Sequence, residues 1–318
     1  MTSLPLSPQA RIGELAGRAR SRAATRLLES LIMGSLILCA LFSVATTFAI
    51  VIVLLEEMIQ FLRLEEVTVV EFFFGTTWAP LLGAEKHFGI WPLVCGTMLV
   101  TLVAAIVALP LGLITAVYLS EYAPRRLRAW LKPVLEILAG IPTVVYGFFA
   151  LTVIIPALRA IDSTFGVYNA AGAGIATGIM CLPIVCSMSE DALRAVPASL
   201  REGALALGGT KFDVSVKVVA PAALSGIVAA FLLAIARAVG ETMIVALAAG
   251  GLARLTLDPR DEVQTMTAYM VQIFLGDASN FGPEYLSSYA VAFMLFVLTL
   301  LLTIIGGRVL KRFREVYE

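Results

Sequence analysis

Long apolar runs constrain this chain more than any other feature of its sequence. Of its 318 residues, 59% are hydrophobic and only 14% are charged, which gives a mean hydropathy of +0.93. A soluble domain of this length would carry more charge, and several runs reach the roughly 20 apolar residues that cross a bilayer as a helix. We predict an all-α integral membrane protein with six transmembrane helices, at residues 31–55, 91–119, 131–155, 170–188, 222–249 and 289–307.

The basic residues predict on which side of the membrane the chain begins and ends. Of the 23 Lys and Arg residues, 17 fall in the N-terminal tail, in two connections and in the C-terminal stretch; the last three segments are 125–132, 194–217 and 308–314. Cytoplasmic segments carry such an excess, so we expect both termini to be cytoplasmic. A secretory signal peptide is the alternative for the basic start, but the apolar run after it is longer than the roughly 7–15 residues of such a peptide.

The cysteines and the single histidine show no pattern typical of a metal or catalytic site. Cys39, Cys95, Cys181 and Cys186 lie in apolar segments without zinc-type spacing, so we interpret them as buried thiols. His87 lies in the connection between the first two predicted spans and is interpreted as an ordinary surface residue. We therefore predict no metal site and no catalytic residue, and a net charge of zero gives no reason to expect a nucleic-acid partner.

Two opposite charges lie inside the fifth predicted span. Arg237 and Glu241 are four residues apart and would share one face of a helix. In hydrocarbon each costs about 2.5–3.5 kcal/mol on insertion scales, so each needs a partner, a water-filled path or a ligand. The residues alone leave two hypotheses open: the pair lines a path for an anion, with Thr242 beside it, or it is a buried ion pair that fixes the helix.

The third predicted span is interrupted by glycine and proline. Pro142 removes a helical hydrogen bond and Gly140 relaxes the backbone, so main-chain groups there can face a pore. Thr143 and Tyr146 would then supply hydroxyl groups to a substrate path. A simple packing kink is the alternative, and we favour it over direct substrate contact.

The connection between the fourth and fifth spans carries the most specific pattern in the chain. Glu202-Gly203-Ala204 is followed at fixed spacing by Gly208, Val218 and Pro221. This stretch resembles the EAA loop of ABC importer permeases, with Gly203 in place of the first Ala and Ala220 in place of a Leu. We expect a helix at 194–207, a break at Gly208-Gly209, and a resumed helix at 211–219.

The resemblance implies a type I, MetI-like architecture in which the short loop helix lies in a cleft of a separate ATP-binding subunit. Glu202, Ala204, Gly208 and Pro221 would carry this coupling. The alternative is an amphipathic helix on the membrane surface. A P-loop is not expected, because Gly209 stands where that motif needs Lys. The chain itself would then be no enzyme and hold no cofactor, since ATP and Mg would be bound by the partner subunits.

Local stretches narrow the resemblance to phosphate permeases of the PstC type, over about residues 72–308. They are Phe73–Pro80, Ser120–Arg126, Ala139–Gly147 and Arg237–Thr242. This resemblance implies a permease subunit of an ATP-driven phosphate importer in the inner membrane of a prokaryote. It also implies a PstA-like sister permease as heterodimer partner, two copies of the ATP-binding subunit, and an extracytoplasmic phosphate-binding protein. The planar guanidinium of Arg237 fits two phosphate oxygens, which a Lys could not match.

We accordingly expect four parts in the chain. These are a basic cytoplasmic tail (1–29), the first span with an acidic outer connection (30–90), the permease transmembrane domain with its cytoplasmic coupling loop at 189–220 (91–310), and a cytoplasmic C-terminal tail (311–318). A permease for another oxyanion such as sulfate or molybdate is the alternative function. A secondary transporter, which would need no ATP-binding subunit, and a passive channel are more distant alternatives.

Overall fold

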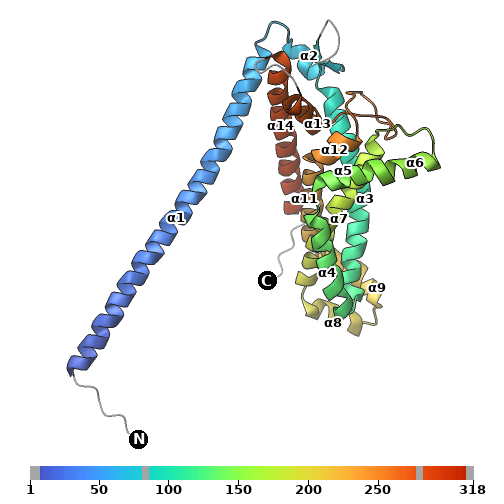
Figure 1. The fold of residues 1–318 in the computed structure, drawn as a ribbon. Coiled ribbons are helices and arrows are strands. Elements are labelled where there is room, and N and C mark those ends of the chain that lie inside the picture. The colour runs from blue at the N-terminus through green and yellow to red at the C-terminus, as the bar shows by residue number, and fades with distance from the viewer. Residues whose placement is uncertain (1–7, 81–85, 277–281, 313–318) are drawn as a thin grey trace. The chain divides into compact units, whose positions relative to one another are not determined.

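The computed structural model describes residues 8–80, 86–276 and 282–312, and the side chains among them from Leu28 to Lys311. It is almost entirely helical, as predicted (Figure 1). The chain divides into two compact units, Met1–Glu56 and Glu57–Glu318. Five of the described helices are long and apolar enough to cross a membrane, and a sixth span is present if the bent pair Lys211–Ala222 and Leu224–Val239 counts as one.

The first unit is formed by most of one long helix, α1 (Pro8–Leu62). Its stretch Leu28–Leu62 has a mean hydropathy of 2.7 and contains the predicted first span. Cys39 on this helix is exposed, so the interpretation of all four cysteines as buried is wrong at this position, whereas Cys181 and Cys186 are buried and Cys95 is half-buried.

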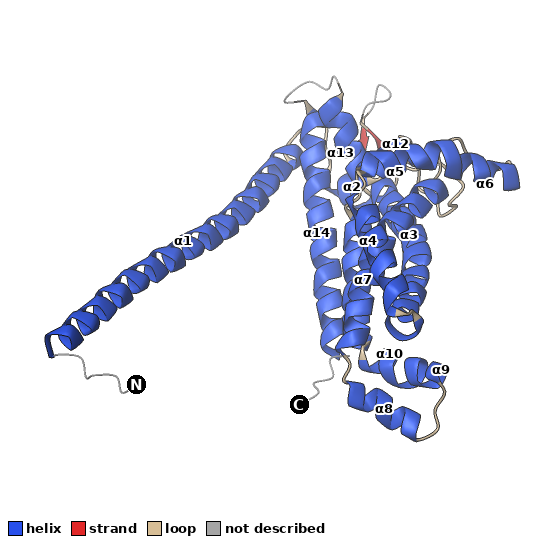
Figure 2. Cartoon of the chain, turned by 60° about the horizontal axis from the view of Figure 1, so that its bottom comes forward, coloured by secondary structure: helices blue, strands red, loops and turns tan. Residues whose placement is uncertain are grey.

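The second unit is built on helices that lie side by side. α7 (Ala170–Ala195) packs against α3 (Trp91–Val117) and α11 (Leu224–Val239), and α11 also contacts α14 (Pro283–Arg312). Figures 1 and 2 show these helices as the long axis of the unit. α3, α7 and α14 confirm the second, fourth and sixth predicted spans: the second continues through a π-helical turn to Tyr122, α7 extends past its predicted end, and α14 extends past both of its predicted ends.

Glycines allow α3 and α7 to approach closely. A Cβ atom on Gly174 would lie 2.6 Å from Cβ of Val103, and one on Gly178 would lie 2.9 Å from the carbonyl oxygen of Ala104. In the reverse direction, Gly112 of α3 lies against Val185 of α7. Small residues at such contacts bring helix backbones together where side chains would separate them.

The third predicted span differs from the structure. Residues Arg125–Gly140 form a separate amphipathic helix, α4, and the apolar helix begins only at Thr143. The break at Ile141–Pro142 causes this, because a residue before proline is kept out of the helical region. The apolar part continues as α5 (Thr143–Phe149), a π-helical turn η2 (Ala150–Ile154) and α6 (Ile155–Ile161), and it runs across the bundle rather than along it (Figure 1).

The loop between α7 and α11 is a chain of short helices at one end of the unit. They are α8 (Ala198–Ala206), α9 (Lys211–Val214), a π-helical turn η3 (Ser215–Val219) and α10 (Ala220–Ala222) (Figure 2). The predicted helix at 194–207 is split, because α7 continues to Ala195 and Pro197 begins a new helix. The predicted break at Gly208-Gly209 is confirmed.

The fifth predicted span is also broken. The helix axis bends by 70° between Ala222 and Leu224, and α11 ends at Val239, with Gly240 following. A separate short helix, α12 (Met243–Ala248), continues from there. The prediction of one helix through 222–249 is therefore wrong, and the chain changes direction at both ends of α11.

The connection between α1 and α3 is folded. It contains α2 (Val69–Phe74) and two short antiparallel strands, β1 (Trp78–Ala79) and β2 (His87–Phe88), in which Trp78 is opposite Phe88. Aromatic side chains from this region pack in a second core with α13 (Met266–Leu275) and α14. These elements lie at the end of the unit opposite α8 and α9 (Figure 1).

Candidate functional site

Arg237 and Glu241 do not share one helix face. Arg237 is in the last turn of α11, whereas Glu241 lies beyond the end of that helix. Gly240 separates them, and glycine is a poor helix former because its backbone is free to leave the helical region. Within the described part of the chain, no ion pair joins the two side chains. The geometry therefore does not support the hypothesis of a buried ion pair on one helix.

The carboxylate of Glu241 is held by backbone groups. The side chain is only 6% exposed, and Oε1 accepts hydrogen bonds from the backbone N–H groups of Met243 at 3.1 Å and Ile244 at 3.2 Å. These N–H groups open α12 and have no partner within that helix. A negative charge at a helix N-terminus is also favoured by the helix dipole. Glu241 thus fixes the turn that follows α11.

Thr267 holds the same turn from the other side. Its hydroxyl donates to the carbonyl oxygen of Glu241 at 2.6 Å, and Thr267 is buried near the start of α13. The sequence does not single out Thr267, since a threonine in an apolar helix carries no pattern that marks it. Thr242, which the sequence places in the substrate path, is half-buried, and its hydroxyl donates to the carbonyl oxygen of Gly240 at 3.2 Å.

Arg237 lies at the surface of the chain. It is exposed, and a cation in the last turn of a helix is favoured by the helix dipole. Its helix is otherwise almost entirely apolar. An arginine on such a helix in a membrane needs water, a second chain or an anionic ligand beside it. Arg237 is therefore the member of the pair that remains available to a substrate.

The hydroxyl of Tyr146 is used inside the chain. It donates to the carbonyl oxygen of Leu138 at 2.8 Å, across the break between α4 and α5, and the Tyr146 side chain is buried. Thr143 is half-buried at the first position of α5. This geometry favours the packing kink over direct substrate contact at Tyr146.

α5 nevertheless lies against the turn that holds Glu241. A Cβ atom on Gly147 would be 2.8 Å from Cδ1 of Leu247 in α12, and Tyr146 and Ile244 belong to the same buried core. The structure thus brings the interrupted third span and the interrupted fifth span together, although the sequence separates them by about a hundred residues.

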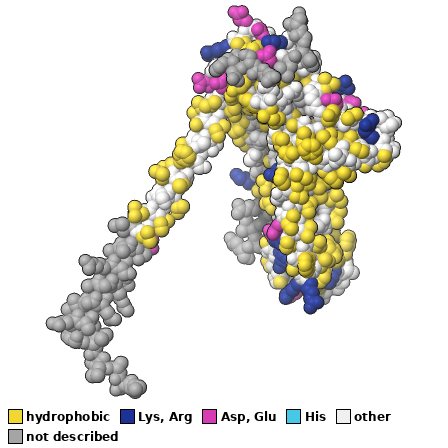
Figure 3. All heavy atoms as spheres, viewed as in Figure 1, with side chains coloured by type: hydrophobic (Ala, Val, Ile, Leu, Met, Phe, Trp, Pro, Cys, Tyr) yellow, Lys and Arg dark blue, Asp and Glu magenta, His cyan; other side chains and the backbone are white. Residues whose placement is uncertain are grey.

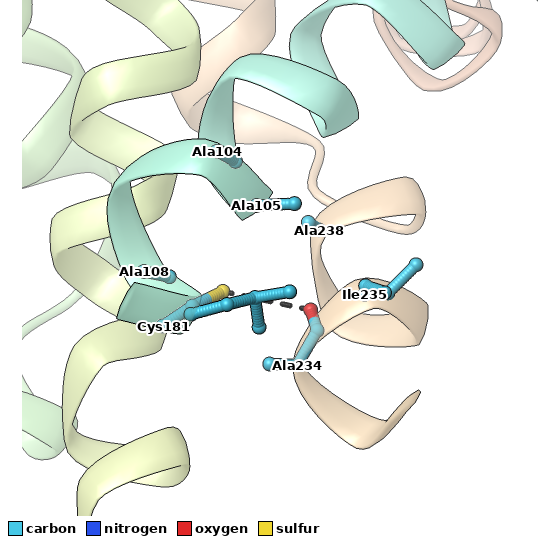
Figure 4. Close-up of a pocket in the computed structure, with 8 residues that line it drawn as sticks. Ala104, Ala105, Ala108, Cys181, Ala234, Ile235 and Ala238 are labelled. Atoms are coloured by element: carbon cyan, nitrogen blue, oxygen red, sulfur yellow. Dashed lines mark hydrogen bonds between the residues drawn. The ribbon is translucent and has the colours of Figure 1, made fainter. Parts of the chain in front are cut away.

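A small cavity lies between α3, α7 and α11, and Ala238, the residue after Arg237, is part of its lining. Its volume is about 10 Å³, and it is lined mainly by alanines, including Ala104, Ala108, Ala234 and Ala238 (Figure 4). The thiol of Cys181 donates to the carbonyl oxygen of Ala234 at 3.7 Å there. A space of this size holds at most one water molecule, and its lining offers no cation to an anion. This cavity is not a substrate path.

The expected coupling residues lie on the loop helices. Glu202 is exposed in α8, and Ala204 is half-buried, its carbonyl oxygen accepting from the N–H of Gly209 at 3.2 Å. Gly208 has φ +87°, a left-handed conformation that side chains with a Cβ avoid. Pro221 is exposed in α10, directly before the 70° bend. The four residues therefore share one loop but do not form one contact cluster.

Large apolar side chains of this loop point away from the chain. Leu205, Leu207 and Phe212 are exposed, Leu207 by 91%. The second helix of the loop begins with a capping box, in which the Thr210 hydroxyl accepts from the N–H of Asp213. A well-defined loop with exposed apolar side chains is typical of a surface that binds another protein.

Ion pairs join elements at the end of the second unit where α2 and the two strands lie. Lys86 lies 2.7 Å from Glu284 and 3.4 Å from Glu66, and the hydrogen bond to Glu284 raises the pKa of Lys86. His87 Nδ1 lies 2.9 Å from Glu71 Oε1. The interpretation of His87 as an ordinary surface residue thus omits a specific carboxylate partner.

Comparisons with known proteins agree with this geometry. Residues 108–315 match the family model described as the binding-protein-dependent transport system inner membrane component. The chain is 34% identical to the probable ABC transporter permease protein YqgH of Bacillus subtilis, over 83% of this chain and 84% of that one. It is 32% identical to the phosphate transport system permease protein PstC of Xylella fastidiosa, over 76% of this chain and 79% of that one.

A solved structure shows the same fold. An inward-facing MetNI methionine ABC transporter has a TM-score of 0.53 to this chain at 20% identity, over 71% of this chain and 95% of that one. The predicted all-α permease architecture is confirmed, and the family and the apolar helices identify a multi-pass protein of the inner membrane. The chain belongs to the family of binding-protein-dependent transport system inner membrane components.

Proposed function

We propose that this chain is a permease subunit of an ATP-driven importer of inorganic phosphate. The observation that carries the proposal is Arg237, an exposed arginine on an apolar helix whose nearest acidic neighbour in sequence, Glu241, is engaged by backbone N–H groups. The identity with a phosphate permease over three quarters of both chains supports phosphate as the substrate class.

The chemistry of Arg237 suits this substrate. Phosphate carries one to two negative charges near neutral pH, and a planar guanidinium donates two parallel hydrogen bonds to two of its oxygens. Glu241 acts indirectly, by holding the turn that ends α11 and so fixing where Arg237 stands. Thr242 and Thr143 remain proposed members of the substrate path, whereas the Tyr146 hydroxyl stabilises the break between α4 and α5.

The path requires a second permease. The cavity lined by Ala234 and Ala238 is too small for an anion, the larger pocket between α11 and α14 is lined almost entirely by apolar side chains, and Arg237 is exposed. A path between this chain and a sister permease would surround the arginine and exclude lipid from it. We therefore propose a heterodimer with a PstA-like chain, together with an extracytoplasmic phosphate-binding protein that delivers the substrate.

Energy comes from separate ATP-binding subunits in this proposal. The exposed Leu205, Leu207 and Phe212 beside Glu202 offer an apolar surface for a cleft in such a subunit. ATP and Mg would be bound there, so this chain needs no cofactor of its own. Closure of two ATP-binding subunits would move α8, and the bend before α11 would convert that movement into a rotation of the helix that carries Arg237.

The distribution of charge supports an orientation. Lys and Arg side chains gather at the end of the second unit where α4 and the loop helices lie (Figure 3). They include Arg125, Arg126, Arg128, Lys132, Lys211 and Lys217. Because cytoplasmic segments are enriched in such residues, we propose that this end faces the cytoplasm. The basic residues of the N-terminal tail and of the C-terminal stretch in the sequence lead us to propose the same side for both termini.

Transport by the reconstituted complex tests the proposal. This chain, its sister permease and the ATP-binding subunits would be placed in liposomes with ATP on the side of the ATP-binding subunits and binding protein on the other side. The proposal predicts uptake of radiolabelled phosphate that needs ATP and is not reduced by excess sulfate. Equal uptake of sulfate or molybdate would establish the alternative oxyanion permease. Phosphate uptake without the ATP-binding subunits would instead identify a secondary transporter.

A further inference from the structure

One arginine of the coupling loop is bonded to three acceptors outside its own helix. Arg201 precedes Glu202 in α8. Its Nη1 donates to the carbonyl oxygen of Val196 at 2.6 Å, and its Nη2 donates to the carbonyl oxygen of Leu193 at 2.7 Å and to Glu121 Oε1 at 3.2 Å. The guanidinium thus connects α8 to the end of α7 and to the distant segment that contains Glu121.

The two carbonyl groups need such a donor. α7 ends at Ala195 because Pro197 follows, and the last carbonyl groups of a helix have no N–H partner within it. Leu193 is fully buried and Val196 nearly so, so water does not easily replace the arginine. The fork of donors on a guanidinium serves three acceptors at once, which a Lys ammonium does with less defined geometry.

The third acceptor, Glu121, lies shortly before the start of α4. Glu121 is in the π-helical turn η1 (Tyr118–Tyr122), which ends α3 and leads through Ala123 and Pro124 into α4. Its side chain is mostly buried, and Oε1 also accepts from the Ser120 hydroxyl at 2.8 Å. Arg201 therefore ties the coupling helix to the segment from which α4 starts.

α4 is tied to the same end of α7 by two further ion pairs. Arg128 Nε lies 2.5 Å from Oε1 of Glu190, a residue only 1% exposed, and Lys132 lies 3.4 Å from Asp191. At its other end α4 reaches the break before α5, which Tyr146 closes. α5 in turn packs on α12, beside the turn that holds Glu241.

We infer that Arg201 is a positioning residue that makes α4 move together with the coupling helix α8. Movement of α8 then reaches the candidate path by two routes, one through the bend into α11 and a second through η1, α4 and α5. This inference rests on the proposed function only in taking α8 as the element that the ATP-binding subunits move.

Distance measurements between the two helices test it. Spin labels would be placed at Ser199 in α8 and Glu136 in α4, both exposed, in the assembled complex of a cysteine-free variant with retained transport. The distance between the labels is expected to stay the same in the nucleotide-free and ATP-trapped states. In Arg201→Gln the distance is expected to change between the two nucleotide states. ATP hydrolysis should continue, while the rate of phosphate uptake should fall about tenfold or more.

Two comparisons make the result decisive. Lys217→Gln removes a cation from the same loop, where Lys217 pairs only with Asp213 among the described residues, and should behave as wild type. Arg201→Lys should restore part of the uptake. A nucleotide-dependent distance in the unsubstituted complex, or an unchanged distance in Arg201→Gln, would overturn the inference. So would an equal loss of ATP hydrolysis and uptake, since this indicates a merely structural role.

Two outcomes are kept apart by the design. If Arg201→Gln does not assemble, Glu121→Gln replaces it, because that variant removes the charge of the partner and leaves both carbonyl contacts intact. It should show the same nucleotide-dependent distance to a smaller degree, and a distance like that of wild type would overturn the inference. If the complex transports another anion, the distance between the labels can still be measured in both nucleotide states. A wrong substrate assignment is therefore distinguished from a wrong inference about Arg201.

Discussion

At the residue scale, the separation of roles between Arg237 and Glu241 follows from what each side chain contacts. Glu241 is buried and accepts two backbone N–H groups, and its own carbonyl oxygen accepts from Thr267. Arg237 is exposed and lies in the last turn of α11, whereas Glu241 follows the end of that helix. A buried acid with backbone partners keeps a turn in place, whereas an exposed cation on an apolar helix can bind and release an anion.

Substitution of Glu241 should distinguish its capping role from a charge role. Glu241→Ala leaves the buried N–H of Ile244 and the part-buried N–H of Met243 without an acceptor, and an unsatisfied buried group costs about 1–3 kcal/mol. Glu241→Gln keeps a side-chain oxygen in place and should lose much less. The unfolding midpoint of the purified protein in detergent measures both. Equal losses in the two variants would contradict the capping role.

The loop between α12 and α13 should respond to acid. Arg260 donates to both carboxylate oxygens of Asp258, at 3.0 Å to Oδ1 and 2.6 Å to Oδ2, and this hydrogen bonding lowers the pKa of Asp258 to about 2. The folded-state pKa lies below the usual value of about 3.9. The stabilising contribution is therefore fully present above about pH 4 and is lost as the pH falls towards 2.

Hydrogen–deuterium exchange of residues 254–265 measures this response. At neutral pH the loop of Asp258→Asn should exchange faster than that of the wild type. The ratio of the two rates should fall towards one as the pH falls from about 4 to about 2, because the wild-type carboxylate is progressively protonated and its pair with Arg260 is lost. A ratio that does not change with pH would show that the pair with Arg260 does not order the loop.

At the scale of elements, the coupling loop depends on one left-handed glycine. Gly208 has φ +87°, and no atom lies within 4 Å of the position that a Cβ would take there, so a larger residue meets backbone strain rather than a clash. A β-branched residue tolerates this conformation worst. We expect Gly208→Val to reduce the amount of ATP-binding subunit that co-purifies with the permease while the apolar helices remain in the membrane.

Gly203 provides the matched control for that substitution. It lies inside α8 with no atom within 4 Å of an added Cβ, and alanine favours a helix interior over glycine by about 0.5–1 kcal/mol. Gly203→Ala should therefore co-purify the ATP-binding subunit at least as well as the wild type. If both variants lose it equally, the surface of α8 rather than the conformation of the turn is the sensitive feature.

Elements that depend on length and apolarity can be predicted from the sequence, and those that depend on tertiary contacts cannot. α3, α7 and α14 have long apolar runs, and Gly208 ends α8 by a local preference that a single sequence reveals. The end of α11 escapes prediction because Gly240 is a weak signal until Glu241 and Thr267 hold the turn. The separation of α4 from α5 is predicted as an interruption at Gly140–Pro142 but not as a change of direction.

The candidate site can be predicted in its residues but not in its arrangement. Arg237 and Glu241 stand out because charges in apolar runs are costly. Their spacing of four suggests one helix face, and the structure assigns them to different elements. Arg201 and Thr267 escape prediction because their roles consist of contacts with residues up to 80 positions away, which a single sequence does not show.

At the scale of the whole molecule, the chain presents features that a second protein would complete. Arg237 is exposed, the cavity near it holds no anion-binding group, and the coupling loop exposes apolar side chains. Both features agree with a subunit whose substrate path is completed by a second permease and whose coupling loop binds an ATP-binding subunit. The proposed importer is such an assembly.

The most direct test of this account is phosphate uptake by the reconstituted complex that carries Arg237→Gln. Loss of hydrogen bonds from a charged group costs about 1.5–3 kcal/mol, so uptake should fall by about ten- to a hundredfold. Arg254→Gln, which removes an exposed arginine of the loop between α12 and α13, should transport as wild type. Undiminished uptake by fully assembled Arg237→Gln complexes would contradict the role of Arg237 in the phosphate path.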